Sequence, residues 1–356
     1  MKNTWRVIDT GLRRAAENIA LNRALLEARQ ADEAPSTLRF LRFTPSALLG
    51  FHQSAEQELN LEYCREQGVA IQRRLTGGGA IYFDDTQLGW ELYLHRQDLG
   101  CADMQTITRR ICEAAARGIQ ALGVDAKFRP RNDIEVDGRK ISGTGGAFDG
   151  DALMYQGTLL IQFDVEKMLR VLRIPAEKLS DKTLASARER VANLADLLGY
   201  VPPLETVQAK LTAAFAAEFG VAFAPGKLSA QEQARFDAAL AEIDTDDWVH
   251  MLRRPLSAMP MLKAAHKFPG GLVRVSVAYD RATQRIKQLW FSGDFFVSPR
   301  RTIADLEAQL RDTDAALLKR HVQDFFAART VDMLGLRPED FVEVIEAALA
   351  QRAIAV

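Results

Sequence analysis

Two stretches of this sequence combine cationic side chains with clustered glycines. The first reads Arg73-Arg74-Leu75-Thr76-Gly77-Gly78-Gly79-Ala80 and separates two apolar runs, 69–71 and 80–83, that have the composition of short strands. Consecutive glycines leave the backbone open to a ligand, so amides can bind an anion while an arginine neutralises its charge. The glycine cluster alone fits a flexible loop beside two solvated arginines better, and the arginine pair together with the second stretch reverses that balance.

The second stretch runs from Arg131 to Gly146 and contains one lysine followed by small and hydroxyl residues. Its Asp137-Gly138 pair is typical of a two-residue hairpin turn. Alternation along the next strand directs Ile141 into a core and Lys140 to the opposite face. Residues 142–146, Ser-Gly-Thr-Gly-Gly, are then expected to present accessible amides beside the ammonium group. Such a site suits a negatively charged acyl-phosphate centre, and the alternative is a surface lysine beside a loop.

Apolar periodicity predicts the elements that position these two stretches. Strands at 37–43, 88–95 and 153–163 alternate with helices at 10–31, 54–67 and 103–122, which indicates a mixed α+β fold. Ser54 is the expected cap of the second helix, and Pro175 is expected to end a short helix at 165–172. Beyond a polar run at 244–247 the pattern restarts with strands at 272–279 and 285–291 and helices at 303–310, 314–328 and 338–350. The sequence therefore predicts two domains, 1–247 and 248–356.

Composition argues against several classes of protein. Lys and Arg together number 46 and Asp and Glu 47, so no basic excess points to nucleic acid as the main partner. Cys64, Cys101 and Cys112 show no paired spacing, which argues against a disulfide framework and favours a cytoplasmic location. Cys112 falls in the predicted helix 103–122 and is interpreted as a small buried hydrophobe. The scattered histidines predict no protein-built metal site, and no apolar run is long enough to span a membrane.

Taken in order, these motifs resemble the lipoate-protein ligase A family over roughly residues 10–200. The matching segments are 73–84, 132–133, 140–143, 157–160 and 190–194. Phe83 and Gln156 stand where many family members have histidine, so pocket shape or the preferred acyl chain is expected to differ. Residues 267–271, Lys-Phe-Pro-Gly-Gly, and 292–296, Ser-Gly-Asp-Phe-Phe, resemble the family's accessory domain, which is a separate chain in some archaea.

The resemblance implies a catalytic fold shared with biotin-protein ligases, in which helices flank a mixed sheet, followed by a small α/β accessory domain. It also implies a two-step reaction. Lipoate, or octanoate, reacts with ATP to give acyl-AMP and pyrophosphate, and a lysine of a lipoyl carrier domain then attacks the mixed anhydride. The carrier would be similar to the glycine-cleavage H protein or to the E2 subunit of a 2-oxoacid dehydrogenase. Mg²⁺ would arrive with ATP, held mainly by phosphate oxygens.

The resemblance further implies residue roles, with Lys140 as the catalytic residue that bridges the acyl carbonyl and the α-phosphate. Some positions are expected to contact both substrates. The residues expected to bind ATP are Arg74, Gly79, Ala80, Ile81, Tyr82, Asn132, Asp133, Lys140, Ser142, Gly143 and Thr144, and those expected to bind lipoate are Arg74, Thr76, Gly77, Gly78, Lys140, Gln156 and Gly157.

Three alternatives stay open. An octanoyltransferase would move an acyl group from a carrier through a cysteine thioester without ATP, but none of the three cysteines lies where that class places its nucleophile. A biotin ligase is disfavoured because the Arg-Arg-x-x-Gly-Gly-Gly pattern with the fused accessory segment is of the lipoate type. A catalytically silent lipoyl-binding protein is disfavoured because Arg74, Asp133 and Lys140 are all present.

Overall fold

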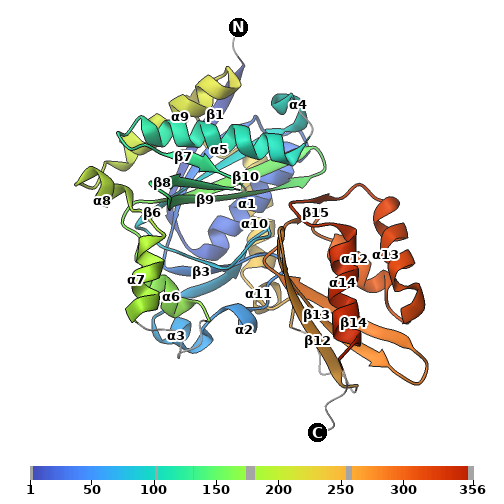
Figure 1. Ribbon diagram of the computed structural model, residues 1–356. Coiled ribbons are helices and arrows are strands. Elements are labelled where there is room, and N and C mark those ends of the chain that lie inside the picture. Colours follow the sequence, from blue (N-terminus) through green and yellow to red (C-terminus); the bar gives the residue numbers. More distant parts are fainter. Residues whose placement is uncertain (1–2, 101–102, 131, 174–180, 254–258, 352–356) are drawn as a thin grey trace. The chain divides into compact units, whose positions relative to one another are not determined.

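The computed structural model describes residues 3–100, 103–130, 132–173, 181–253 and 259–351 (Figure 1). The predictions for Cys101, Arg131 and Pro175 lie outside these residues. The chain divides into two compact units. The first comprises Met1–Leu48, Ala55–Leu75 and Ala80–Val249, and the second comprises Leu49–Ser54, Thr76–Gly79 and His250–Val356. The two domains predicted from the sequence, 1–247 and 248–356, remain a prediction.

An eight-stranded mixed sheet forms the centre of the first unit (Figure 1). Its first three strands are parallel to one another, and the remaining neighbours are antiparallel. The order across the sheet is β11 (Ala222–Pro225), β1 (Thr4–Arg13), β2 (Thr37–Phe43), β6 (Gln87–His95), β10 (Ala152–Leu160), β9 (Arg139–Asp149), β8 (Asp133–Val136) and β7 (Lys127–Arg129).

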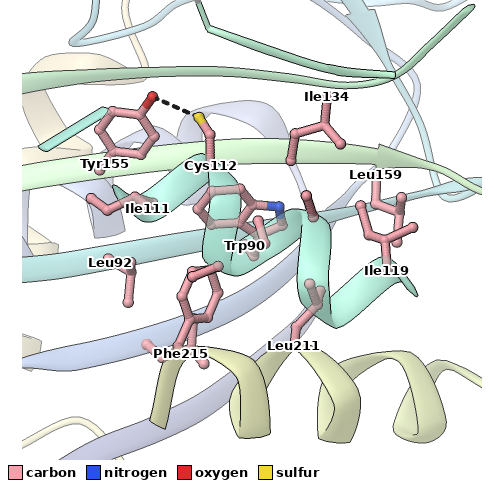
Figure 2. Close-up of a cluster of buried hydrophobic side chains, with 14 of the residues drawn as sticks. Trp90, Leu92, Ile111, Cys112, Ile119, Ile134, Tyr155, Leu159, Leu211 and Phe215 are labelled. Atoms are coloured by element: carbon pink, nitrogen blue, oxygen red, sulfur yellow. Dashed lines mark hydrogen bonds between the residues drawn. The ribbon is translucent and has the colours of Figure 1, made fainter. Parts of the chain in front are cut away.

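Helices cover both faces of this sheet. On one face α5 (Met104–Gln120) packs beside α9 (Leu204–Phe219), and on the other α1 (Ala15–Gln30) packs beside α10 (Ala230–Ile243). The predicted inner stripe of α5 is confirmed, because Ile107, Ile111, Ala115 and Ile119 are all buried. Figure 2 shows the core on the face covered by α5 and α9, where Trp90 of β6 lies among Ile111, Leu211 and Phe215. The shorter helices are α2 (Ala55–Glu58), α3 (Leu61–Glu66), α4 (Arg96–Leu99), α6 (Val165–Val171), α7 (Asp181–Glu189), α8 (Leu194–Leu198) and α11 (Asp246–Val249).

A small three-stranded sheet carries the first motif. It has the order β4 (Ala70–Arg73), β3 (Ser46–Leu49) and β5 (Ile81–Phe83). The strands predicted on either side of the glycine stretch therefore exist, and the glycines form the loop between β4 and β5.

The second unit is built around an antiparallel sheet with the order β12, β13, β14, β16. The valines of β13 face a core that includes Phe341 and Ile345 of α14. The strands predicted at 272–279 and 285–291 are confirmed as β13 and β14, whereas β12 was not predicted. The elements are β12 (Met261–Phe268), β13 (Gly271–Asp280), β14 (Arg285–Gly293), β15 (Val297–Ser298), α12 (Thr302–Gln309), β16 (Thr313–Asp314), η2 (Ala315–Leu317), α13 (Leu318–Ala327), β17 (Asp332–Met333) and α14 (Pro338–Leu349). None of the helices in the described part of the chain is long and apolar enough to cross a membrane.

Three local predictions were wrong. The start of the helix predicted at 10–31 belongs to β1, because pairing of Leu12 and Arg13 with β2 outweighs local helical periodicity. The helix predicted at 54–67 is divided into α2 and α3, because the Asn60 side chain accepts a hydrogen bond from Tyr63 N (3.2 Å) and starts a new helix. The amides of residues 142–146, which were expected to be accessible, belong to the middle of β9, whose backbone pairs with β8 and β10.

Candidate active site

Lys140 occupies the position at which β9 leaves its hairpin with β8. Asp137 and Gly138 form the turn, both with positive φ (51° and 74°), which confirms the predicted hairpin. The register then shifts, so that Glu135 faces Lys140 while Ile134 faces Ser142. Ile141 is the extra residue of this β-bulge and is fully buried, whereas 41% of the Lys140 side chain is exposed. The predicted assignment of Ile141 to the core and Lys140 to the opposite face is therefore confirmed.

The bulge decides which residues share a face with Lys140. In a regular strand residues 140 and 143 would point to opposite faces, but the additional residue brings them to the same one. A Cβ at Gly143 would lie 2.8 Å from Cε and Nζ of Lys140, so the lysine side chain lies directly over this glycine. Asp133 is the cross-strand partner of Gly143, and its Oδ1 accepts a hydrogen bond from Lys140 Nζ at 2.8 Å.

The backbone of Lys140 is held by the segment that follows α7. Lys140 N donates to Arg190 O, and Ala192 N donates to Lys140 O, both at 2.9 Å. Asn193 then fixes the next turn, because its side chain bonds both N and O of Phe163. The sequence match at 190–194 thus has a structural reason, since this segment forms a short parallel bridge beside the lysine.

A second cation, Arg129 of β7, shares Asp133 with Lys140. Arg129 donates to Asp133 Oδ2 at 2.7 Å, and its other terminal nitrogen lies 3.2 Å from Glu135 Oε2. Burial would raise the pKa of Asp133, but the charge and hydrogen bond of Lys140 and the contacts of Arg129 lower it overall. Sequence reasoning missed Arg129, and only the cross-strand register of β7 and β8 could have indicated it.

The hydroxyl and amide side chains of the second motif mostly bond the protein itself. Asn132 Nδ2 donates to Thr144 O, and Thr144 N and Oγ1 donate to Asn132 O at 3.0 and 2.8 Å. Thr144 Oγ1 also contacts the Tyr155 hydroxyl (2.8 Å) and Cys112 Sγ (3.2 Å) on the core side of the sheet. Ser142 is fully buried, and its Oγ has no hydrogen-bond partner within the described residues.

Two residues expected to bind lipoate lie next to each other on β10. Gln156 is half-buried and pairs in register with Gly145, while Gly157 pairs with Thr144. A Cβ at Gly157 would lie 2.2 Å from the Trp90 ring, so this glycine is required by core packing. Gln156 points to the opposite face of the strand, the face on which Lys140 lies.

The described cysteines are poor nucleophiles. Cys112 is fully buried in α5, and Figure 2 shows its sulfur beside the Tyr155 hydroxyl. The two atoms lie 3.3 Å apart. Burial raises the pKa of the Cys112 thiol, and burial also raises the pKa of Cys64 to about 11. A thiol that stays protonated at neutral pH reacts slowly, so both residues act as packing groups.

The two arginines of the first motif have different surroundings. Arg73 is buried and donates to the carbonyls of Trp248 (3.2 Å) and Val249 (2.6 Å), so it fastens α11 to β4. Arg74 is also buried and donates to Leu48 O at 2.8 Å. Burial lowers the pKa of Arg74 to about 10, and a bound anion would favour its charged form.

The nucleotide-binding segment predicted after the glycines belongs to β5. Ile81 and Tyr82 pair with Leu48 and Ala47 of β3. Burial raises the pKa of Tyr82, and the nearby Asp84 carboxylate raises it further. Lys167 Nζ lies 5.3 Å from the centre of the Tyr82 ring.

The glycine loop itself belongs to the second unit, together with Thr76. Gly78 N donates to Phe295 O at 3.2 Å, so this amide is engaged by the protein rather than exposed. A Cβ at Gly77 would lie 2.2 Å from Phe295 O, and one at Gly78 would lie 2.7 Å from the Phe296 ring. Gly77 and Gly78 are therefore required by close approach of the Ser-Gly-Asp-Phe-Phe segment, whereas a Cβ at Gly79 would lie 3.9 Å from Asp294 Cβ, an ordinary contact.

The sequence-predicted residues thus fall into three groups. Neighbouring strands of the large sheet, and the turn before β8, bring one group together. Arg74, Ala80, Ile81 and Tyr82 lie on or beside the small sheet, whereas Thr76 and the three glycines lie in the second unit. The first group contains Asn132, Asp133, Lys140, Ser142, Gly143, Thr144, Gln156 and Gly157. Among the described residues, no group of three or more His, Cys, Asp or Glu side chains could hold a metal ion.

Comparison with known proteins places this arrangement in a family. The octanoyltransferase LipM of Kyrpidia tusciae is 29% identical over 269 residues, which cover 69% of this chain and 98% of that protein. The solved bi-partite lipoate protein ligase of Thermoplasma acidophilum, described with its E2 lipoyl domain, is 27% identical with a TM-score of 0.62, covering 72% of this chain and all of that one. A lipoate-protein ligase A bound with ATP is 25% identical with a TM-score of 0.61, covering 71% of this chain and all of that one.

These similarities confirm the predicted mixed α+β fold and the predicted family, and they include enzymes of two kinds, ligases and octanoyltransferases. Residues 14–216 match the family described as the lipoyl protein ligase A/B catalytic domain. Because that match spans more than half of the chain, this protein belongs to the lipoyl protein ligase A/B catalytic domain family.

Proposed function

We propose that this protein is an ATP-dependent lipoate–protein ligase. A lipoate or octanoate carboxylate attacks the α-phosphorus of ATP, the bond to pyrophosphate breaks, and acyl-AMP forms. The amine of an acceptor lysine then attacks the acyl carbonyl, and AMP leaves. The observation that carries this choice is the contrast between an accessible ammonium group on Lys140 and two buried cysteine thiols, Cys64 and Cys112. A ligase of this kind needs an accessible ammonium group to stabilise the negative charge that develops, whereas a thioester mechanism needs an accessible thiolate.

The proposed residue roles follow from charge and position. Lys140 donates hydrogen bonds to the acyl carbonyl and the α-phosphate, where negative charge develops. To do so it must exchange its bond with Asp133 for bonds to substrate. Arg74 supplies a buried positive charge for a carboxylate or phosphate. Mg²⁺ is expected to arrive with ATP, bound mainly to phosphate oxygens.

The proposed acceptor is a lipoyl carrier domain of the H-protein or E2 kind. The solved archaeal relative described together with its E2 lipoyl domain supports this choice. The sequence expectations for Asn132, Ser142 and Thr144 are retained as proposals for ATP, although their side chains bond or pack within the protein in this structure.

A second candidate is an octanoyltransferase that uses a thioester. The similarity to LipM of Kyrpidia tusciae over almost the whole of that protein favours it. Cys101 would then be the nucleophile to examine, since it lies outside the described residues while Cys64 and Cys112 are buried.

One experiment separates the two candidates. Purified protein is assayed for ATP–pyrophosphate exchange with lipoate, octanoate or biotin, and in parallel for ATP-free transfer from an octanoyl carrier. Lipoate-dependent exchange that survives Cys101→Ser is the expected result. Transfer without ATP, abolished by Cys101→Ser, together with no exchange at millimolar ATP and Mg²⁺, would establish the transferase instead.

A further inference from the structure

Four charged side chains, Arg129, Asp133, Glu135 and Lys140, form a cluster on one face of the strands that carry Lys140. The register of β7 and β8 places Arg129 opposite Asp133, and the bulge in β9 places Lys140 opposite Glu135. Alternation then directs all four to the same side. Lys127 of β7 shares this face, but its ammonium group bonds Asp125 at 2.7 Å. The segment 190–192 contributes backbone groups at this point.

The bonding within this cluster is asymmetric. Asp133 gives one oxygen to each cation, at 2.7 Å to Arg129 and 2.8 Å to Lys140, while Glu135 contacts Arg129 at 3.2 Å. The hydrogen bond to Asp133 is the main reason that the pKa of Arg129 is raised. With all four groups ionised, the cluster is neutral. Lys140 is therefore held by a carboxylate that another cation already partly neutralises.

When the Lys140 ammonium group moves from Asp133 to substrate, the net charge of the cluster changes. When Lys140 leaves, Arg129, Asp133 and Glu135 remain, with a net charge of about −1. Without Arg129 the same movement would leave two adjacent carboxylates with about −2. Like charges at this separation repel, and their combined field would retain the ammonium group.

We propose that Arg129 is a positioning residue that makes Lys140 available to substrate by neutralising the carboxylates that would otherwise retain it. This inference rests on the proposed function, because the substrate that Lys140 meets is the acyl-phosphate centre. Arg129 touches no reacting atom and acts through Asp133 and Glu135. The competing explanation is that the ion pairs of Arg129 only hold β7 against β8, in which case its charge has no influence on Lys140.

The test uses the full chain and a charge-restoring second change. Arg129→Met should lower the turnover of lipoate-dependent ATP–pyrophosphate exchange about tenfold, on the scale of one hydrogen bond to a charged group. KM for ATP and for lipoate should stay within about twofold. Adding Glu135→Gln returns the charge left behind to about −1, and turnover should recover to within about twofold of the unchanged protein. Arg129→Lys should also retain most of the activity.

Arg117→Met is the matched control. Its side chain is 46% exposed against 45% for Arg129, and it bonds Glu218 at 2.6 Å in the same unit. It should leave exchange unchanged.

A second readout does not depend on catalysis. The rate at which acetic anhydride labels the Lys140 amine is followed against pH by peptide mass spectrometry. The midpoint should move to higher pH in Arg129→Met and return in the double variant, since a more negative cluster retains the proton.

The possible results distinguish a failure of the positioning role from a failure of the proposed ligase function. The positioning role is wrong if Arg129→Met matches the unchanged protein in both readouts. It is also wrong if Glu135→Gln fails to restore a lost turnover, and in either case Arg129 only stabilises the pairing of β7 with β8. If the unchanged protein shows no lipoate-dependent exchange, the ligase proposal is wrong, and the labelling midpoint still decides whether Arg129 acts on Lys140.

Discussion

Lys140 is the side chain on which the proposed chemistry depends most directly. Lys140→Ala should reduce acyl-adenylate formation by about 3 kcal/mol of transition-state stabilisation, or roughly 100-fold, as when an oxyanion donor is lost. The fold should persist, because the side chain is 41% exposed and contributes no core packing. Single-turnover formation of lipoyl-AMP measures the loss, and an unchanged melting temperature is the control. Normal turnover in this variant would remove Lys140 from the mechanism.

Two glycines of neighbouring strands should respond differently to the same added methyl group. At Gly143 the new Cβ meets only the flexible end of Lys140, so Gly143→Ala should displace the lysine and lower exchange while stability stays nearly constant. At Gly157 the new Cβ would overlap the fully buried ring of Trp90, so Gly157→Ala should destabilise the protein by about 3 kcal/mol through overpacking. Urea unfolding and exchange assays on both variants check this. Equal unfolding midpoints for the two would contradict the assigned packing.

The contact between β1 and α10 should make stability depend on pH. Glu232 is fully buried and forms an ion pair with Arg6, and it also belongs to the capping box that begins α10. Burial raises the pKa of Glu232, but the Arg6 and Ser229 hydrogen bonds lower it overall. A carboxyl with a lowered pKa stabilises the fold above the ordinary glutamate range, and this stability is lost as pH falls through the lowered value.

Glu232→Gln should therefore lower the free energy of unfolding by about 2 kcal/mol at pH 7. The difference from the unchanged protein should shrink towards pH 4, because the glutamate of the unfolded chain binds a proton there while Glu232 in the fold, whose pKa is lowered, is still largely ionised. Denaturant unfolding at several pH values measures it. A gap that stays constant from pH 7 to pH 4 would show that the charge of Glu232 is not what stabilises this contact.

At the level of elements, the sequence predicted what depends on local pattern. The Asp137-Gly138 turn, the apolar stripe of α5 and the side on which Lys140 lies were all correct. What failed depends on partners distant in the chain. β1 exists because it pairs with residues 37–43 and 222–225, and residues 142–146 are a strand because both neighbours bond them. Arg129 entered the site only through the register of β7 against β8, which no local pattern encodes.

At the level of the whole molecule, the second unit should be needed for activation. The glycine loop, Thr76–Gly79, belongs to this unit, where Gly78 N donates a hydrogen bond to Phe295 O. A chain ending at Val249 should therefore still transfer lipoyl from preformed lipoyl-AMP but activate free lipoate about 100-fold more slowly, as expected when a binding loop loses its position. Comparing both half-reactions in the two chains measures this. Equal activation rates would show that the loop needs no support.

The end point of that shortened chain matters. Arg73 is buried and bonds the carbonyls of Trp248 and Val249, so a chain ending at Asp247 would leave its guanidinium without these partners. That shorter chain should melt at a lower temperature than the one ending at Val249, which serves as the folding control. Identical melting curves would contradict the role given to Arg73.

The bond between Gly78 and Phe295 also sets an order of events during synthesis. These residues are 217 positions apart, so the glycine loop leaves the ribosome long before its partner exists. At ordinary translation rates of about 5–20 residues per second the interval is roughly 10–40 s. His52, whose carbonyl accepts from Gly293 N, waits for a similar time. The nascent chain can form much of its central sheet in that period, but its glycine loop gains this bond only after Phe295 has been made.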